Sequence, residues 1–132
     1  MSRIFFKRGY RYRLESAYEH PEWLDLPDFH SKWFSCADGV LTVADGYCWD
    51  GASGPAIDSR NFLRGSLVHD ALYQAIREGL LTPEHRRIAD LTLFAVIRQD
   101  GMPWLRAKWV LWAVSRFGPS DGGESRPIES AP

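Results

Sequence analysis

The hydrophobic pattern changes once along this chain of 132 residues, and that change restricts the fold more than any other feature. Up to about residue 50, short β-type runs such as residues 10–14 and 40–43 alternate with turn signals like Asp38-Gly39. From residue 58 onward, apolar residues recur at helical spacing instead. We therefore predict an α+β fold in which a small N-terminal antiparallel sheet is followed by three helices.

The ends of the three helices are marked by capping and stop signals. Asp58 or Ser59 can cap the first helix, Gly79 follows its last turn, and Thr82-Pro83 can start the second. The predicted helices cover residues 58–78, 82–99 and 104–117. We treat residues 1–118 as a single domain, with 1–50 β-rich and 58–117 helical, and expect residues 119–132, rich in Gly, Ser, Pro and Glu, to be a disordered tail.

Composition excludes several classes of protein. A net charge of −1 argues against nucleic acid as a partner, which usually requires a basic face. Two cysteines, Cys36 and Cys48, are too few for a disulfide framework and allow one bridge at most. Basic residues interrupt the first twenty positions, so we expect no signal peptide, and no run approaches the ~20 apolar residues of a spanning helix. We expect synthesis in the cytoplasm.

A histidine, a tyrosine and a carboxylate form the first candidate site. His69 and Tyr73 are four residues apart and share a helical face, while Asp90 interrupts an apolar helical stretch and needs a partner if buried. Packed antiparallel, the two helices would let Asp90 accept hydrogen bonds from His69 and Tyr73, leaving the other imidazole nitrogen as a base for water. The alternatives are that Asp90 pairs with Arg86 or Arg87, and that His69 lies on a solvated face.

The second candidate site is a loop with three glycines at residues 46–55. Such a loop can turn its backbone carbonyls inward, toward a hard cation that prefers oxygen ligands, and Asp70 on the following helix offers a carboxylate. Asp50, within the loop, can instead cap a turn through its own backbone.

These motifs carry two resemblances. Tyr47-x-x-x-Gly51, the His-Asp-x-x-Tyr motif at residues 69–73 and Asp90 on the next helix resemble phospholipase A2 in its compact viral-capsid form, over residues ~47–97. The Tyr-Cys-Trp-Asp-Gly-Ala-Ser-Gly-Pro loop at residues 47–55, together with the same helix, resembles an uncharacterised family of phage and bacterial domains over residues ~1–118.

The phospholipase A2 resemblance implies a helix pair that carries a catalytic group and a calcium site. His69 would be the general base that activates water, with Tyr73 and Asp90 supporting it. The calcium ion would be bound by Asp70 and by three backbone carbonyls, those of Tyr47, Trp49 and Gly51. The substrate would be a glycerophospholipid ester, so a phospholipid or membrane surface would be a partner, and the source would be a phage or prophage.

Two other functions remain open. Trp49 stands where the enzymes have a loop glycine, which favours a non-catalytic phage accessory or virion protein that binds other virion proteins through its aromatic surface. A third interpretation is a metal-dependent phosphohydrolase that uses His30, His69, Asp70 and Asp90.

Aromatic residues are 14% of the chain and include six tryptophans. Three of them lie on the third helix and are expected in the core, because that helix is apolar nearly all round. They are Trp104, Trp109 and Trp112. The alternative is a membrane-facing patch in which the basic residues of the same helix meet lipid phosphates. In the irregular segment before residue 40, Trp23, Trp33 and Phe34 are expected to be freer to contact a lipid or a partner.

Overall fold

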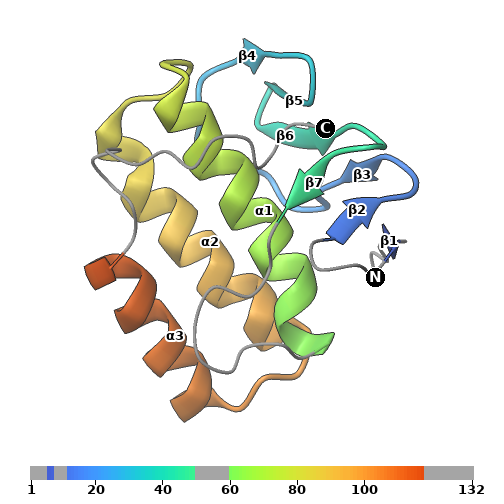
Figure 1. Cartoon of the computed structure of the whole chain (residues 1–132). Helices are drawn as coiled ribbons and strands as arrows, with labels where there is room; N and C mark the ends of the chain where they lie inside the picture. The colour runs from blue at the N-terminus through green and yellow to red at the C-terminus, as the bar shows by residue number, and fades with distance from the viewer. Residues whose placement is uncertain (1–5, 8–11, 50–59, 118–132) are drawn as a thin grey trace.

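The computed structural model describes residues 6–7, 12–49 and 60–117 (Figure 1). Antiparallel strands are followed by three helices, so the expected α+β class is confirmed. The strands are β1 (Phe6–Lys7), β2 (Tyr12–Leu14), β3 (Tyr18–Glu19), β4 (Phe29–His30), β5 (Phe34–Ala37), β6 (Val40–Val43) and β7 (Cys48–Trp49). The helices are α1 (Arg60–Arg77), the 3-10 turn η1 (Pro83–His85), α2 (Arg86–Gln99) and α3 (Trp104–Phe117).

The strands form two small sheets where the sequence predicted one. A three-stranded sheet has the order β1-β2-β7 and a four-stranded sheet has the order β3-β6-β5-β4. The chain bends at Glu15 and Ser16, which separates β2 from β3 and puts them in different sheets. The tightest connection is the β5–β6 hairpin, where Asp38 and Gly39 have φ angles of 52° and 77°. Positive φ at both central residues is typical of a type I′ turn, the turn that suits a two-residue hairpin.

Strand β5 corrects one expectation. Phe34 was expected in an irregular segment and free to contact a partner, but it lies in β5 opposite Val43 and is only 2% exposed. Nearby prolines favoured an irregular chain, whereas pairing with β6 produces the strand. Trp23, by contrast, is exposed, and Trp33 is half-buried.

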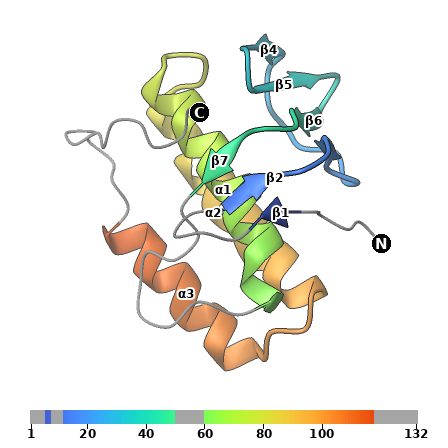
Figure 2. The same cartoon turned by 45° about the vertical axis from the view of Figure 1, so that its right-hand side comes forward.

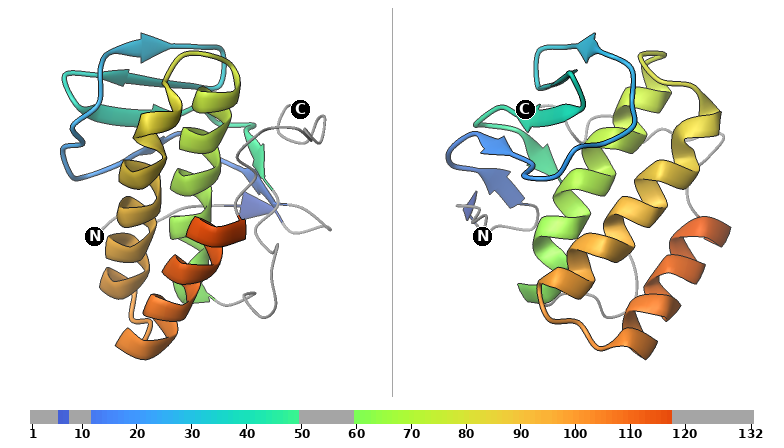
Figure 3. Two further views of the ribbon diagram at one scale, coloured as in Figure 1. Left: turned by 90° about the vertical axis from the view of Figure 1, so that its left-hand side faces the viewer. Right: turned by 180° about the vertical axis from the view of Figure 1, so that it is seen from behind.

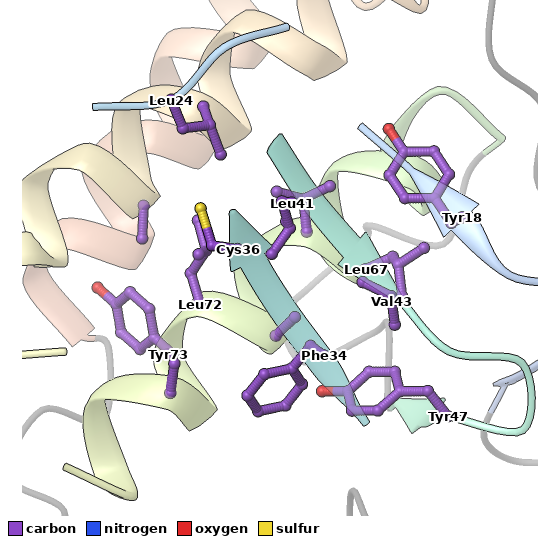
Figure 4. Close-up of a cluster of buried hydrophobic side chains, with 14 of the residues drawn as sticks. Tyr18, Leu24, Phe34, Cys36, Leu41, Val43, Tyr47, Leu67, Leu72 and Tyr73 are labelled. Carbon is purple, nitrogen blue, oxygen red and sulfur yellow. The ribbon is translucent and has the colours of Figure 1, made fainter. Parts of the chain in front are cut away.

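The elements are stacked in sequence: α1 lies between the strands and α2, and α3 packs against α2 away from the strands (Figures 1 and 2). The larger apolar core lies between the strands and α1, where Phe34, Cys36 and Leu41 face Leu67 and Leu72 (Figure 4). A second core joins the three helices through Phe62, Leu93, Ile97, Met102, Ala107 and Val110. The view from behind shows α1 and α2 running antiparallel, side by side (Figure 3).

Helix α3 contradicts the expectation that its tryptophans belong to the core. Ala107 and Val110 are buried, but Trp104, Trp109 and Trp112 are 53%, 44% and 52% exposed. The helix packs through one face only, so being apolar nearly all round did not predict burial all round.

The helix ends agree closely with their sequence signals. Gly79 follows α1 with a φ of 82°, and the Leu80 N–H donates to the Ala75 carbonyl, as at a glycine-terminated helix. After Thr82, the first turn is 3-10 rather than α-helical. The predicted cap at Asp58 or Ser59 and the predicted tail at 119–132 lie outside the described residues. Among the helices that are described, none has the length and hydropathy needed to span a bilayer.

Cys36 and Cys48 are both free thiols, so the single bridge that the sequence allowed is not formed. Burial raises the pKa of Cys36, which keeps this thiol protonated inside the core.

Candidate functional site

The candidate site lies where α1 and α2 pack together, and a glycine permits their close approach. Gly65 is one turn before His69 on α1. A Cβ atom at Gly65 would lie 2.6 Å from Ile97 Cγ2 and 2.7 Å from Leu93 Cδ1, both on α2. Such contacts are too short for real side chains, so the present spacing of the two helices requires glycine there. That spacing is what brings His69 within reach of Asp90.

Asp90 receives hydrogen bonds from both residues that the sequence paired with it. His69 Nε2 lies 2.7 Å from Asp90 Oδ1, and the Tyr73 hydroxyl donates to the same oxygen at 2.8 Å. The His69 and Tyr73 rings are 4.2 Å apart between centroids, as expected for residues one helical turn apart. The structure thus joins His69, Tyr73 and Asp90 in a single cluster.

Ser115 is a member of this cluster that the sequence did not reveal. Its hydroxyl donates from α3 to the second carboxylate oxygen, Asp90 Oδ2, at 3.3 Å. Each of the three helices therefore contributes at least one side chain to the cluster. The one signal for Ser115 is its hydroxyl in a helix that otherwise has only apolar and basic residues, and its register against Asp90 depends on how α3 packs.

The hydrogen bonds to Asp90 indicate which atoms of the cluster are donors. An ionised carboxylate only accepts hydrogen bonds, so His69 donates from Nε2 and a neutral ring then has its lone pair on Nδ1. Burial, reinforced by the hydrogen bond to Asp90, raises the pKa of Tyr73 above its ordinary value of 10.0. Tyr73 therefore keeps its proton and remains a donor to Asp90.

The side chains of the cluster are mostly shielded from solvent but keep a small exposed area through which a water molecule could reach them. The Asp90 side chain is 9% exposed and the His69 side chain 12%. A buried carboxylate needs partners, and three donors supply them. Among the described residues, Asp90 forms no ion pair with Arg86 or Arg87, so that alternative is wrong. His69 is likewise not on a solvated face.

Two of the predicted calcium ligands lie in or next to β7, one lies on α1, and one lies outside the described residues. The Tyr47 carbonyl accepts a hydrogen bond from the Leu14 N–H at 2.9 Å. Trp49 lies opposite Tyr12, two residues farther along the same ladder, where antiparallel pairing again directs its backbone toward β2. Asp70 is half-buried on α1. Gly51, like Asp50, lies outside the described residues.

These described atoms do not form a calcium shell. Calcium takes six to eight oxygen ligands, whereas the backbone of Tyr47 and Trp49 takes part in the sheet pairing. The Trp49 side chain is also buried, and its indole N–H donates to Ser66 Oγ at 2.9 Å. Calcium therefore stays a prediction, and no step below depends on it.

The phosphohydrolase interpretation fails on geometry. Within residues 12–49 and 60–117, no three or more His, Cys, Asp or Glu side chains come together in a way that could hold a metal ion. His30 lies in β4, on a strand of the four-stranded sheet, so it does not join His69, Asp70 and Asp90.

Comparison of the chain with protein-family models, with curated proteins and with solved structures found no match.

Proposed function

We propose that this chain is a hydrolase of glycerophospholipid esters, phage or prophage encoded, in which His69 is the general base. The observation that carries the proposal is the pair of short hydrogen bonds from His69 Nε2 and the Tyr73 hydroxyl to one oxygen of Asp90. This arrangement orients the imidazole and leaves Nδ1 to accept a proton. The choice of substrate rests on the resemblance of the motifs around Tyr47, His69 and Asp90 to phospholipase A2.

The proposed reaction needs only His69, Asp90 and one water molecule. His69 Nδ1 takes a proton from a water molecule as the water oxygen attacks the ester carbonyl. The resulting imidazolium is stabilised by the Asp90 carboxylate, which does not itself take up the proton. When the tetrahedral intermediate collapses, the imidazolium returns the proton to the departing alkoxide, giving a free fatty acid and a lysophospholipid. General base catalysis of this kind contributes typically about 10²–10⁴-fold to the rate.

The test is release of fatty acid from phospholipid vesicles by the full chain, with added calcium and with a chelator. His69→Gln should abolish release and leave the fold intact, because glutamine can still donate to Asp90 but has no basic nitrogen. His30→Gln, at an exposed position in β4, is the matched control and should keep full activity. Wild-type protein that releases no fatty acid in either condition would refute the proposal. Release of fatty acid that persists in the presence of the chelator would show that the reaction does not need calcium.

A second candidate is a non-catalytic phage accessory or virion protein built on the same scaffold. The observation that favours it is the engagement of the Tyr47 and Trp49 backbone in the sheet, which leaves those two predicted ligands inside the fold. Recovery of the chain in purified virions, together with no hydrolysis of lipid, would support this candidate over the enzyme.

A further inference from the structure

The outward face of α3 concentrates large apolar side chains at the surface. Trp104, Leu105, Trp109 and Trp112 are 53%, 74%, 44% and 52% exposed. Their spacing puts them on one side of the helix, opposite the buried Ala107 and Val110. Isolated exposed apolar residues are ordinary, but a group of this size on one helix is typical of an interaction surface.

Basic side chains lie among these tryptophans. Lys108 Nζ is 5.6 Å from the Trp104 ring centroid, and the Arg116 guanidinium carbon is 5.3 Å from that of Trp112. With Arg106, they give α3 three cationic residues and no acidic one. Tryptophan beside lysine or arginine suits the boundary between lipid headgroups and acyl chains, where the ring is partly buried and the cation reaches a phosphate.

We propose that this face of α3, defined by Trp104, Leu105, Lys108, Trp109, Trp112 and Arg116, binds the surface of a bilayer that contains anionic phospholipid. The choice of a phospholipid surface rests on the proposed function. The charge of the helix also argues against a second copy as the occupant. In a two-fold contact through α3, the basic residues of the helix would come close to the same basic residues of the second copy, and like charges at an interface are unfavourable.

The position of α3 connects this surface with the candidate site. Ser115 is on the same helix and donates to Asp90, so α3 is in direct contact with the His69 cluster and also carries the proposed membrane face. Since no described helix can span a bilayer, the helix would lie along the membrane surface and not cross it.

The experiment measures sedimentation with sucrose-loaded vesicles, anionic or purely zwitterionic, using wild-type protein and His69→Gln. Both should bind anionic vesicles equally, and more weakly in about 0.5 M salt, because binding does not need the base. The double variant Trp104→Ser/Trp109→Ser should lose binding at least about tenfold. Trp23→Ser separates this face from the other exposed tryptophan that the sequence offered for a lipid contact: Trp23 is 67% exposed but lies outside α3, so this variant should bind like wild type.

A second pair of variants tests the charge. Lys108→Glu should weaken binding to anionic vesicles by about tenfold or more, since each basic residue near such a surface contributes roughly fivefold and the glutamate adds repulsion. Lys32→Glu is its control, because Lys32 also lies over a tryptophan, 5.0 Å from the Trp33 ring centroid, but not on α3. The proposal would be overturned if the wild-type protein did not sediment with vesicles. It would also be overturned if the wild-type protein formed a dimer that Trp104→Ser/Trp109→Ser converts to monomer. Vesicle binding without hydrolysis would leave it standing and refute the proposed enzyme instead.

Discussion

Asp90 of α2 holds the candidate site together, because three donors from α1 and α3 share its two carboxylate oxygens. His69 and Tyr73 could be predicted from sequence, since their four-residue spacing and a carboxylate within an apolar stretch are local signals. Ser115 could not, because its contact requires the position of α3 relative to α2. Similarly, His85 Nδ1 accepts the Thr82 backbone N–H at 3.0 Å at the start of η1, a contact that the Thr82-Pro83 start signal did not reveal.

Replacing the carboxylate by its amide tests the role of Asp90 as an anion. Asp90→Asn preserves the shape of the side chain but cannot stabilise an imidazolium on His69. We expect fatty acid release to fall by roughly 10²–10⁴-fold while the circular dichroism spectrum is unchanged. Glu84→Gln, an exposed carboxylate in η1, is the control for loss of one negative charge. Full activity of Asp90→Asn would mean that Asp90 is purely structural.

The two hydroxyls on Asp90 should differ in their contribution to stability. Tyr73→Phe removes a buried 2.8 Å hydrogen bond to the carboxylate, and we expect the free energy of unfolding to fall by about 1.5–3 kcal/mol. Ser115→Ala removes a longer bond of 3.3 Å from an exposed residue, so its effect should be smaller, about 0.5–1 kcal/mol. Urea unfolding measures both. A larger loss for Ser115→Ala would contradict this ranking.

Among the elements, the α1–α2 pair depends on Gly65. In an open helix, Gly65→Ala would stabilise by about 1 kcal/mol through helix propensity. Here the added methyl meets Ile97 and Leu93, so we expect a net loss of about 1–3 kcal/mol in the free energy of unfolding and weaker catalysis, as His69 moves away from Asp90. Ile97→Ala removes the methyl that Gly65→Ala would strike, so the double variant should lose less stability than the sum of the two single ones. Strict additivity in urea unfolding would show that the helices do not need this contact.

How far the elements could be predicted depended on whether their signals were local. The turn at Asp38-Gly39 and the glycine stop after α1 are set by neighbouring residues, and both were predicted, although the strand that makes this turn a hairpin was not. Strand β5 was missed because pairing with β6, not its own sequence, makes it extended. The exposed tryptophans of α3 were misassigned for a related reason. An apolar helix indicates burial only if other elements cover all its faces, which sequence periodicity does not report.

Across the whole molecule, Arg64 ties the β-rich half to the end of α2. It is 5% exposed, and its guanidinium binds both oxygens of Asp100 at 2.9 Å and 3.0 Å. It also donates to the Tyr18 hydroxyl of β3 at 2.9 Å. Since the Tyr18 hydroxyl lies 3.0 Å from His20 Nδ1, the arrangement suits a chain of donors from Arg64 through Tyr18 to a neutral His20. The contact between the halves is therefore sensitive to the protonation of His20.

This network predicts that stability falls in mild acid. Burial lowers the pKa of His20 below its ordinary 6.5, with Arg64 acting in the same direction and Glu22 opposing both. Because the pKa of His20 is lower in the folded state than in the unfolded state, protonation of His20 favours unfolding. The contribution of the neutral ring to stability is therefore complete above pH 6.5 and is lost as the pH falls below that value. We expect the Tm to drop between pH 7 and about pH 5, and His20→Gln to reduce that drop. His30→Gln, at an exposed histidine, should keep the wild-type slope. Equal slopes for wild type and His20→Gln would show that the acid sensitivity arises elsewhere in the chain.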